Sequence, residues 1–382
     1  MWQESSETVS PLRSGLTTGS CATACCVAAC RSLFAKDNPV LVEISLPRGK
    51  LVELPISDYQ PLTDSRNGVR VSTVKDAGDD PDATHGATVF VELALITEPG
   101  VVFKAAKGVG TVTKTGLLLE VGEPAINPVP RKMMSQHLQN YAAVYQYQGG
   151  FEVSVGVVDG EQIALKTMNG RLGILGGLSI LGTTGIVRPF SCAAYIASIR
   201  QGVDVASSNG VTHIAAATGS SSEAAIAEHY QLADMALIEM GDFVGALLKH
   251  LKKGQVRKLS ICGGFGKMTK LAQGALDLNS RKCSIDFVFL QRCVTQLLEQ
   301  QTTAAEISTA QQQQLLDSVG KANTSIEVLN LCMAQQLPLA QLVCQLAQQQ
   351  AALIVAATVT VEVFAINRKG EIIASTVTVD QQ

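Results

Sequence analysis

The sequence predicts a protein of two domains: an N-terminal α+β domain with a mixed sheet and a C-terminal α/β domain with a Rossmann-like layer. With 382 residues, the chain is long enough for two domains of about 150 residues each. Its first half is rich in β-like runs, and its second half alternates short apolar runs with helix-like segments. We expect the first domain at 1–170 and the second at 171–356. We leave open whether the last hairpin, 357–380, returns to the sheet of the first domain.

The composition is that of a folded protein with an aliphatic core and little net charge. Hydrophobic residues make up 46% of the chain, aromatic residues 4% and charged residues 16%. A net charge of −3 and the lack of a dense Lys/Arg tract argue against nucleic acid as a partner. The first residues lack a secretory pattern, and no run of about 18 consecutive apolar residues occurs. We therefore expect a cytoplasmic protein with no membrane partner.

A helix of small residues is expected near the N-terminus, at 21–30. Thr17 and Thr18 place hydroxyls around its first turn, where a carboxylate or phosphate would be stabilised. An ordinary N-cap before a buried helix is an equally weighted alternative. This helix holds four of the ten cysteines of the chain at helical spacing, and no Cys-x-x-Cys occurs anywhere. We interpret them as buried structural residues and expect no metal site.

Strands dominate the rest of the first domain. The expected elements are a hairpin of 40–46 and 51–56, strands at 69–74, 87–96 and 151–157, and a helix at 130–146. The aspartate-rich loop at 75–82 lacks the residue ladder of a calcium loop. A solvated or substrate-facing loop is the better interpretation.

Cations gather around glycine and proline turns between these strands. They are Lys104, Lys107, Lys114, Arg131 and Lys132. Such a group would suit a ligand with several carboxylates, and an ordinary solvated surface explains it equally well.

A segment of glycines, hydroxyls and short aliphatic residues lies in the middle of the chain, at 176–191. It contains Gly176, Gly177, Thr183 and Thr184, and it leads into a helix expected at 192–200. Glycines at this density allow close approach to a ligand or to another backbone segment, and the helix N-terminus would offer free N–H groups. The alternative is a tight corner within a core.

The second half follows the pattern of an α/β layer with parallel strands. We expect strands at 211–217 and 256–262, helices at 221–229, 243–252 and 268–276, a helical Gln- and Ala-rich region at 297–352, and a hairpin of 359–366 and 371–378. Ligands of such sheets collect beyond the carboxyl ends of the strands.

Three post-strand segments therefore belong on one rim. Thr218 and Gly219 follow one strand, and 263–267 follows the other. Between them, Asp242 or Glu239 is suited to accept hydrogen bonds from the ribose of a nucleoside cofactor, and we select Asp242. A helix N-terminal acid is the alternative.

The chain as a whole resembles the CbiD family, the cobalt-precorrin-5B C1-methyltransferases of cobalamin (vitamin B12) biosynthesis. The motifs that carry the resemblance extend over most of the chain, at 12–22, 122–130, 176–191, 266–267 and 270–272. Some members of the family have a histidine just before the Gly-Lys pair, where this chain has Gly264 and Phe265. We therefore assign no catalytic residue and no general base.

The resemblance implies transfer of a methyl group from S-adenosylmethionine to C1 of cobalt-precorrin-5B, which gives cobalt-precorrin-6A. Such a transfer needs no dedicated nucleophile, because positioning of the reactants supplies much of the acceleration, on an upper scale of about 7–11 kcal/mol. The carboxylates of the macrocycle would explain the cations and helix N-termini. A corrinoid-pathway reductase that uses a nicotinamide cofactor, or a non-catalytic corrinoid carrier, are the alternatives.

The site residues follow from this hypothesis. We expect S-adenosylmethionine on the rim of the second domain, at Gly176, Gly177, Thr183, Thr184, Thr218, Gly219 and Asp242. The corrinoid substrate is then expected between the domains, at Arg13, Thr17, Thr18, Lys104, Lys107 and Arg188. Whether the chain forms a homo-oligomer is left open.

Overall fold

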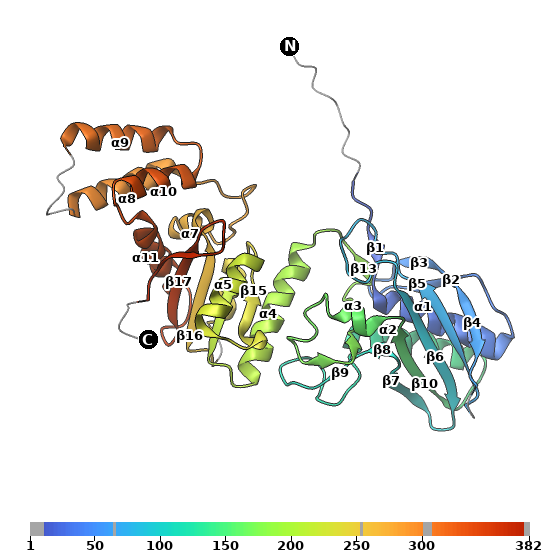
Figure 1. Ribbon diagram of the computed structural model, residues 1–382. Helices are drawn as coiled ribbons and strands as arrows, with labels where there is room; N and C mark the ends of the chain where they lie inside the picture. The colour runs from blue at the N-terminus through green and yellow to red at the C-terminus, as the bar shows by residue number, and fades with distance from the viewer. Residues whose placement is uncertain (1–10, 64–65, 253–254, 301–307, 378–382) are drawn as a thin grey trace, which may run out of the picture. The chain divides into compact units, whose positions relative to one another are not determined.

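The protein consists of two compact units, Met1–Cys192 and Ala193–Gln382 (Figure 1). The computed structural model describes residues 11–63, 66–252, 255–300 and 308–377. The boundary follows Cys192, whereas the sequence analysis placed it after residue 170. The reason is that the central glycine segment pairs with strands of the first unit, as described below.

The first unit contains a five-stranded mixed sheet in the order β4-β5-β6-β10-β7. All neighbours are antiparallel except β10 and β7, which are parallel. These strands are β4 (Asp58–Pro61), β5 (Gly68–Val74), β6 (Thr88–Ile96), β7 (Gly100–Ala105) and β10 (Gly150–Val157). A separate hairpin of β2 (Leu41–Ser45) and β3 (Leu51–Pro55) confirms the prediction for 40–56.

One face of this sheet is covered by α1 (Thr18–Cys30), which packs against β5, β6 and α2 (Pro128–Val144). Every residue of α1 is buried, which its small side chains permit. With the π-helical turn η1 (Arg31–Ala35), the 18 residues Thr18–Ala35 are apolar enough to span a membrane by length and composition, but 72% of them are buried inside the fold. Burial raises the pKa of Cys21 to about 12, so this thiol stays protonated.

The central glycine segment and the two residues before it are joined to the rest of the first unit by three short strand pairs. β11 (Ile174–Leu175) pairs with β9 (Thr111–Val112), and β12 (Gly177–Leu178) pairs with β8 (Gly108–Val109). β13 (Ile186–Val187) pairs with β1 (Gly15–Leu16). The short helix α3 (Gly160–Ala164) packs against β8 and β12.

The second unit contains a five-stranded sheet in the order β15-β14-β16-β17-β18. The first four strands are parallel to one another and β18 is antiparallel. They are β14 (His213–Ala217), β15 (Leu237–Glu239), β16 (Lys258–Gly264), β17 (Thr360–Ile366) and β18 (Ile372–Ser375). The C-terminal hairpin thus belongs to this sheet and not to that of the first unit, because β17 pairs along its whole length with β16. Residues 378–380 of the expected hairpin lie outside the described residues.

Helices cover both faces of the second sheet (Figure 1). On one face, Ile226 of α5 packs with Ala215, Cys262 and Phe364 of the strands. On the other face, helices α4, α6, α7 and α11 share a core with the strands, and α8, α9 and α10 extend that core. The helices are α4 (Cys192–Ser208), α5 (Ser220–Tyr230), α6 (Val244–His250), α7 (Phe265–Ala272), α8 (Phe287–Gln300), α9 (Thr309–Lys321), α10 (Ser325–Ala334) and α11 (Leu339–Ala352), with a 3₁₀ turn η2 (Asp234–Ala236). Residues 301–307 of the expected helical region lie outside the described residues.

Candidate functional site

The carboxyl ends of three parallel strands meet on one rim of the second unit. The N–H of Met240, just after β15, donates to the Ala217 carbonyl of β14 at 2.9 Å, and the N–H of Thr218 donates to the Cys262 carbonyl of β16 at 3.1 Å. From β14 the chain passes to β15 on one side and then crosses to β16 on the other. Ligands of open α/β sheets bind where the strand order reverses in this way.

Two helices begin at this rim beside glycines that leave open space. α5 begins after Gly219, whose N–H donates to the Ser222 hydroxyl at 3.1 Å, and α7 begins after Gly264 with no side-chain cap. A Cβ atom added to Gly219 or Gly264 would meet no other atom within 4 Å. By contrast, a Cβ on Gly263 would lie 2.8 Å from the Thr218 hydroxyl oxygen. The rim therefore has room for a polar ligand above Gly219 and Gly264, next to two helix N-termini.

Asp242 lies on the same rim, but its carboxylate already has partners. One oxygen forms an ion pair with Lys267, and the other accepts from the Asn279 amide at 3.2 Å. Burial, followed by the charge of Lys270, lowers the pKa of Lys267. Lys270 itself is 7% exposed and donates to the Leu278 carbonyl at 2.9 Å. These contacts fix the loop around Asn279 to the start of α7.

Glu239 is an exposed carboxylate at the end of β15, next to the end of β14. It lies about 20 residues after Gly219, the spacing at which an acid binds the ribose in dinucleotide-binding sheets. Its charge acts on Tyr195 of α4. Burial, together with the charge of Glu239, raises the pKa of Tyr195. Asp242 follows closely along the chain, so this spacing does not select between the two carboxylates.

In the first unit, the glycine segment closes over the N-terminus of α1. Thr17 caps the helix by accepting from the N–H of Ser20 at 3.2 Å. The Thr18 hydroxyl contacts both the carbonyl and the N–H of Leu181, at 3.3 and 3.2 Å, and the Ser20 hydroxyl donates to the Gly185 carbonyl at 2.8 Å. Thr17 is 5% exposed and Thr18 is 4% exposed. Both hydroxyls that the sequence analysis assigned to the substrate are thus used inside the protein.

Four residues expected on the rim of the second domain lie in the first unit instead. They are Gly176, Gly177, Thr183 and Thr184. The physical reason is backbone pairing: Gly177 pairs with Gly108, so close that a Cβ on Gly177 would lie 2.4 Å from the Gly108 carbonyl carbon. Gly176 and Thr183 are exposed, and the Thr184 hydroxyl contacts the Ile186 backbone. Of the seven residues assigned to the cofactor, the rim of the second unit holds Thr218, Gly219 and Asp242.

The cations of the first unit fall into two groups. Arg13 and Arg188 flank the same end of the β1–β13 pair, at which Gly15 lies opposite Val187. Arg13 forms an ion pair with Asp76 and thereby lowers the pKa of that carboxyl to about 2, whereas Arg188 is exposed.

Lys104 belongs to the second group, on the edge strand β7. Its ammonium donates to Glu152 at 2.6 Å on the sheet face opposite α1, because the neighbouring Val153 and Val155 point into the α1 core. Lys107 follows β7 and is exposed. The structure therefore gathers Arg13, Arg188 and the α1 N-terminus in one region and places Lys104 elsewhere in the unit.

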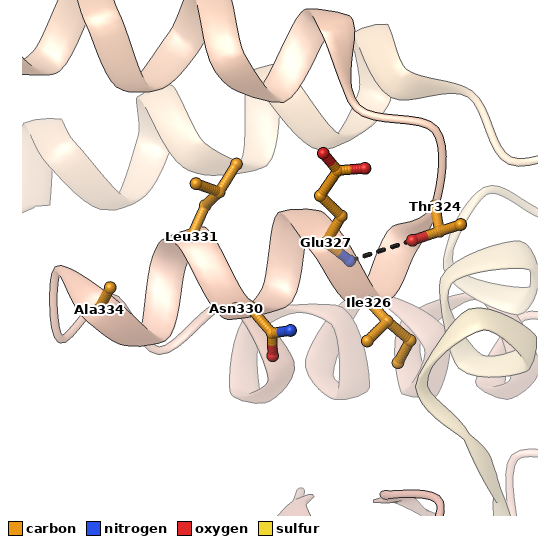
Figure 2. Close-up of a pocket in the computed structure, with 6 residues that line it drawn as sticks. All are labelled: Thr324, Ile326, Glu327, Asn330, Leu331 and Ala334. Carbon is orange, nitrogen blue, oxygen red and sulfur yellow. Dashed lines mark hydrogen bonds between the residues drawn. The ribbon is translucent and has the colours of Figure 1, made fainter.

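Two other features carry no chemistry that we can assign. Among the described residues, no group of three or more His, Cys, Asp or Glu side chains could hold a metal ion. A shallow hollow of about 400 Å³ lies along α10 (Figure 2). Its lining residues are Thr324, Ile326, Glu327, Asn330, Leu331 and Ala334. Glu327 is the ionisable residue among these six, and its backbone N–H donates a hydrogen bond to the Thr324 hydroxyl at 3.2 Å.

The family models and the similar sequences point to one family. The model of the family described as CbiD matches residues 5–189, and the one described as CbiD, C-terminal domain, matches residues 301–377. A protein of Marinomonas sp. (strain MWYL1) named cobalt-precorrin-5B C(1)-methyltransferase is 58% identical over 392 residues, covering 100% of this chain and 98% of its own. A protein of the same name from Paraburkholderia phytofirmans is 56% identical, covering 98% of this chain and 100% of its own. A crystal structure titled cobalamin biosynthesis protein (cbiD), from Archaeoglobus fulgidus, is 28% identical with a TM-score of 0.38, covering 71% of this chain and 83% of its own.

Proposed function

The chain belongs to the CbiD family, and from this membership we infer that it transfers a methyl group from S-adenosylmethionine to C1 of cobalt-precorrin-5B. The observation that carries the inference is 58% identity to a relative of that name over 100% of this chain. The protein is thus an S-adenosylmethionine-dependent C-methyltransferase of cobalamin biosynthesis.

We propose that the second unit is a Rossmann-like layer that binds S-adenosylmethionine where its strand order reverses. Three features support the proposal: the open space above Gly219 and Gly264, the N-termini of α5 and α7, and the carboxylates of Glu239 at the end of β15 and of Asp242 after it. Thr218 and Gly219 would hold the ligand from one side, and Asp242 would act mainly by fixing Lys267 and the Asn279 loop. S-adenosylmethionine supplies a methyl carbon bonded to a sulfonium sulfur, which leaves as a neutral thioether.

We propose that the macrocycle binds to the first unit. Arg13, Arg188 and Lys107 would pair with its carboxylates, and Lys104 would contribute from the outer sheet face. The exposed Gly176 and Thr183 would approach the ring from the glycine segment, which the buried Thr17 and Thr18 hold in place. The work of these residues is to orient the ring carbon for in-line attack and to exclude water, since no nucleophilic side chain is required.

The direct test is transfer of label. Purified protein incubated with cobalt-precorrin-5B and S-adenosylmethionine carrying a ¹³C methyl group should yield a macrocycle labelled at C1, read by carbon NMR. An unlabelled macrocycle, with substrate shown to be active by a second enzyme of the family, would contradict the assignment. Turnover of NADPH would then indicate a reductase, and tight corrinoid binding alone would indicate a carrier. The comparisons do not favour either alternative.

A binding experiment tests where the methyl donor sits. Asp242→Ala releases Lys267 and opens the rim, so we expect the affinity for S-adenosylhomocysteine to fall more than the affinity for the macrocycle. Asp204→Ala, an exposed carboxylate of α4 paired with His250, is the matched control. Equal loss for both ligands, or no loss, would move the methyl donor away from this rim.

A further inference from the structure

We infer that the aspartate-rich loop at 75–82 positions Phe190, and that the ring of Phe190 packs against the apolar face of the macrocycle. The inference rests on the proposed function, because it concerns the macrocycle that we place on the first unit. It gives a role to a loop for which the sequence offered only a solvated or substrate-facing interpretation.

Three carboxylates of this loop hold the two chain segments that leave the same end of the β1–β13 pair. Asp79 accepts from the N–H of Arg13 at 2.6 Å, and its own N–H donates to the Arg13 carbonyl at 2.9 Å. Asp80 accepts from the N–H of Phe190 at 2.9 Å. Asp76 forms the ion pair with the Arg13 guanidinium, and one of the two contacts measures 2.9 Å. Because Asp79 and Asp80 are adjacent in the chain, they hold Arg13 and Phe190 close together.

The loop is itself anchored to the first unit behind these carboxylates. Lys75 is 1% exposed, and its ammonium donates to Asp82 at 2.5 Å and to the Thr84 hydroxyl at 2.7 Å. The N–H of Ala77 donates to the imidazole of His85 at 3.1 Å. A loop fixed in this way can impose a backbone conformation on the segment that it holds.

The backbone of Phe190 has a conformation that such a residue rarely adopts. Its φ is 54°, in the left-handed region that disfavours a non-glycine side chain. The other non-glycine residues with a positive φ in the described part of the chain all have polar or charged side chains: Lys36, Gln146, Asp159, Gln231 and Gln336. Conformations of this kind persist where the surroundings impose them, and they concentrate at sites that hold a ligand. For Phe190, the hydrogen bond to Asp80 is such a constraint.

The ring that this backbone carries is presented to solvent beside two guanidinium groups. Phe190 is 67% exposed, although burial of a phenylalanine side chain is strongly favourable. Leu12, which directly precedes Arg13, is 55% exposed, and Arg188 is exposed as well. The macrocycle has the complementary pattern, an apolar ring face bordered by carboxylates. Packing on Phe190 would fix the tilt of the ring, while the arginines would bind its edge.

The first experiment removes the aromatic ring and measures the macrocycle. It uses the full chain, with kinetics of methyl transfer and calorimetric titration with the macrocyclic product. Phe190→Ala should raise the KM and the Kd for the macrocycle by about 10- to 100-fold, the range for burial of a phenylalanine side chain, with kcat at saturation nearly unchanged. Phe190→Tyr keeps the ring and should behave almost as the wild type does. Val144→Ala trims an exposed apolar side chain at the end of α2 and should change nothing.

Phe190→Gly separates contact with the ligand from a structural role. Glycine adopts the left-handed conformation without strain, so the free energy of unfolding of this variant in urea should be no lower than that of the wild type. The variant should nevertheless weaken macrocycle binding at least as much as Phe190→Ala does. A clear loss of stability in Phe190→Gly would show that the ring packs within the protein, and it would overturn the inference.

Asp80 is tested as a positioning residue through its coupling to Phe190. Asp80→Ala removes the acceptor and should weaken macrocycle binding by about 3- to 10-fold, whereas Asp80→Asn keeps an acceptor oxygen and should restore binding. In the Phe190→Ala background, Asp80→Ala should have no further effect on macrocycle binding. An undiminished effect in that background, or an equal loss in Asp80→Asn, would mean that the carboxylate does not act through Phe190.

The outcomes separate this inference from the function on which it rests. If the wild-type chain neither binds the macrocyclic product nor transfers label, the proposed function is wrong and the role of Phe190 is wrong with it. If the wild type is active, and Phe190→Ala and Phe190→Gly bind the macrocycle as well as it does, only the role of Phe190 is wrong. A rise in the KM for S-adenosylmethionine alone would contradict the inference by placing the ring at the methyl donor.

Discussion

Replacing Gly182 with alanine tests whether the glycine segment serves to approach the N-terminus of α1. A Cβ at this position would lie 2.5–2.7 Å from three side-chain atoms of Thr17. Thr17 has little freedom to move, because its hydroxyl caps Ser20 and its N–H donates to the Gly185 carbonyl at 3.1 Å. Gly176, in the same segment, is the matched control, since a Cβ there would meet nothing within 4 Å.

The two substitutions share one energetic term and differ in another. Gly182 has a φ of 135° and Gly176 a φ of 83°, so alanine costs about 1–2 kcal/mol of backbone strain at each. Gly182→Ala adds a clash with Thr17, and such overpacking destabilises by about 1–3 kcal/mol. It also disturbs the N-cap that Thr17 provides, whose loss costs about 1 kcal/mol. We expect Gly182→Ala to destabilise the first unit by about 3–6 kcal/mol and Gly176→Ala by about 1–2 kcal/mol.

Native-state hydrogen exchange measures this difference locally. Amide protons of α1 should exchange tens- to hundreds-fold faster in Gly182→Ala than in Gly176→Ala, at about 1.4 kcal/mol per factor of ten. Peptides of α7 in the second unit serve as the internal reference. Equal acceleration of α1 exchange in the two variants would show that backbone strain alone explains both, and the proposed close approach would be refuted.

Three further predictions concern charge. Burial acts to raise the pKa of Glu362, but hydrogen bonds from Tyr230 and Lys258 outweigh it and lower the pKa. The ionised carboxylate therefore stabilises the fold above about pH 4.3, and this stabilisation is lost as the pH falls through the pKa of the folded state. Glu362→Gln should destabilise the second unit, by up to about 3–5 kcal/mol. In urea denaturation at a series of pH values, the free energy of unfolding of this variant should fall less steeply at acid pH than that of the wild type. Burial, followed by the charge of Lys258, lowers the pKa of His213 below its usual 6.5, so the unfolded chain binds the proton more readily and stability falls as pH drops below about 6.5. His213→Gln should remove this decline, and a profile unchanged from wild type would contradict it. Arg188→Gln should raise the KM for the macrocycle by up to about 5-fold, the range of one exposed charge contact, and leave the KM for S-adenosylmethionine unchanged; a reversed pattern would place Arg188 at the methyl donor.

Local patterns predicted most of the fold. The alternation at 69–74 and 87–96 corresponds to β5 and β6, whose inward residues enter the α1 core. β15 went unrecognised because Leu237–Glu239 is too short to show any period. α7 begins at Phe265, earlier than expected, since its glycine-rich start resembles a loop. α4 extends to Ser208, beyond the expected end at residue 200.

The candidate site was predictable only where chain order determines it. Thr218 and Gly219 follow a strand and therefore had to lie at the carboxyl edge of the sheet. The glycine segment was assigned to the wrong unit because it is held by its backbone groups. The Leu181 carbonyl, for example, accepts a hydrogen bond from the Thr18 hydroxyl, and such a contact cannot be recognised from residue types.

The closure of α1 by the glycine segment also determines when the first unit can finish folding during synthesis. The hydrogen bond from Thr18 to Leu181 joins residues 163 apart in the chain. At about 5–20 residues per second, a ribosome needs on the order of 10–30 s to add them. During that interval the hydroxyls of Thr18 and Ser20 and the N–H of Thr17 lack their partners in the glycine segment, and the small-residue helix behind them has an open end. A fragment that stops at residue 170 would remain in this state permanently, so the shortest autonomous first unit extends to about Cys192.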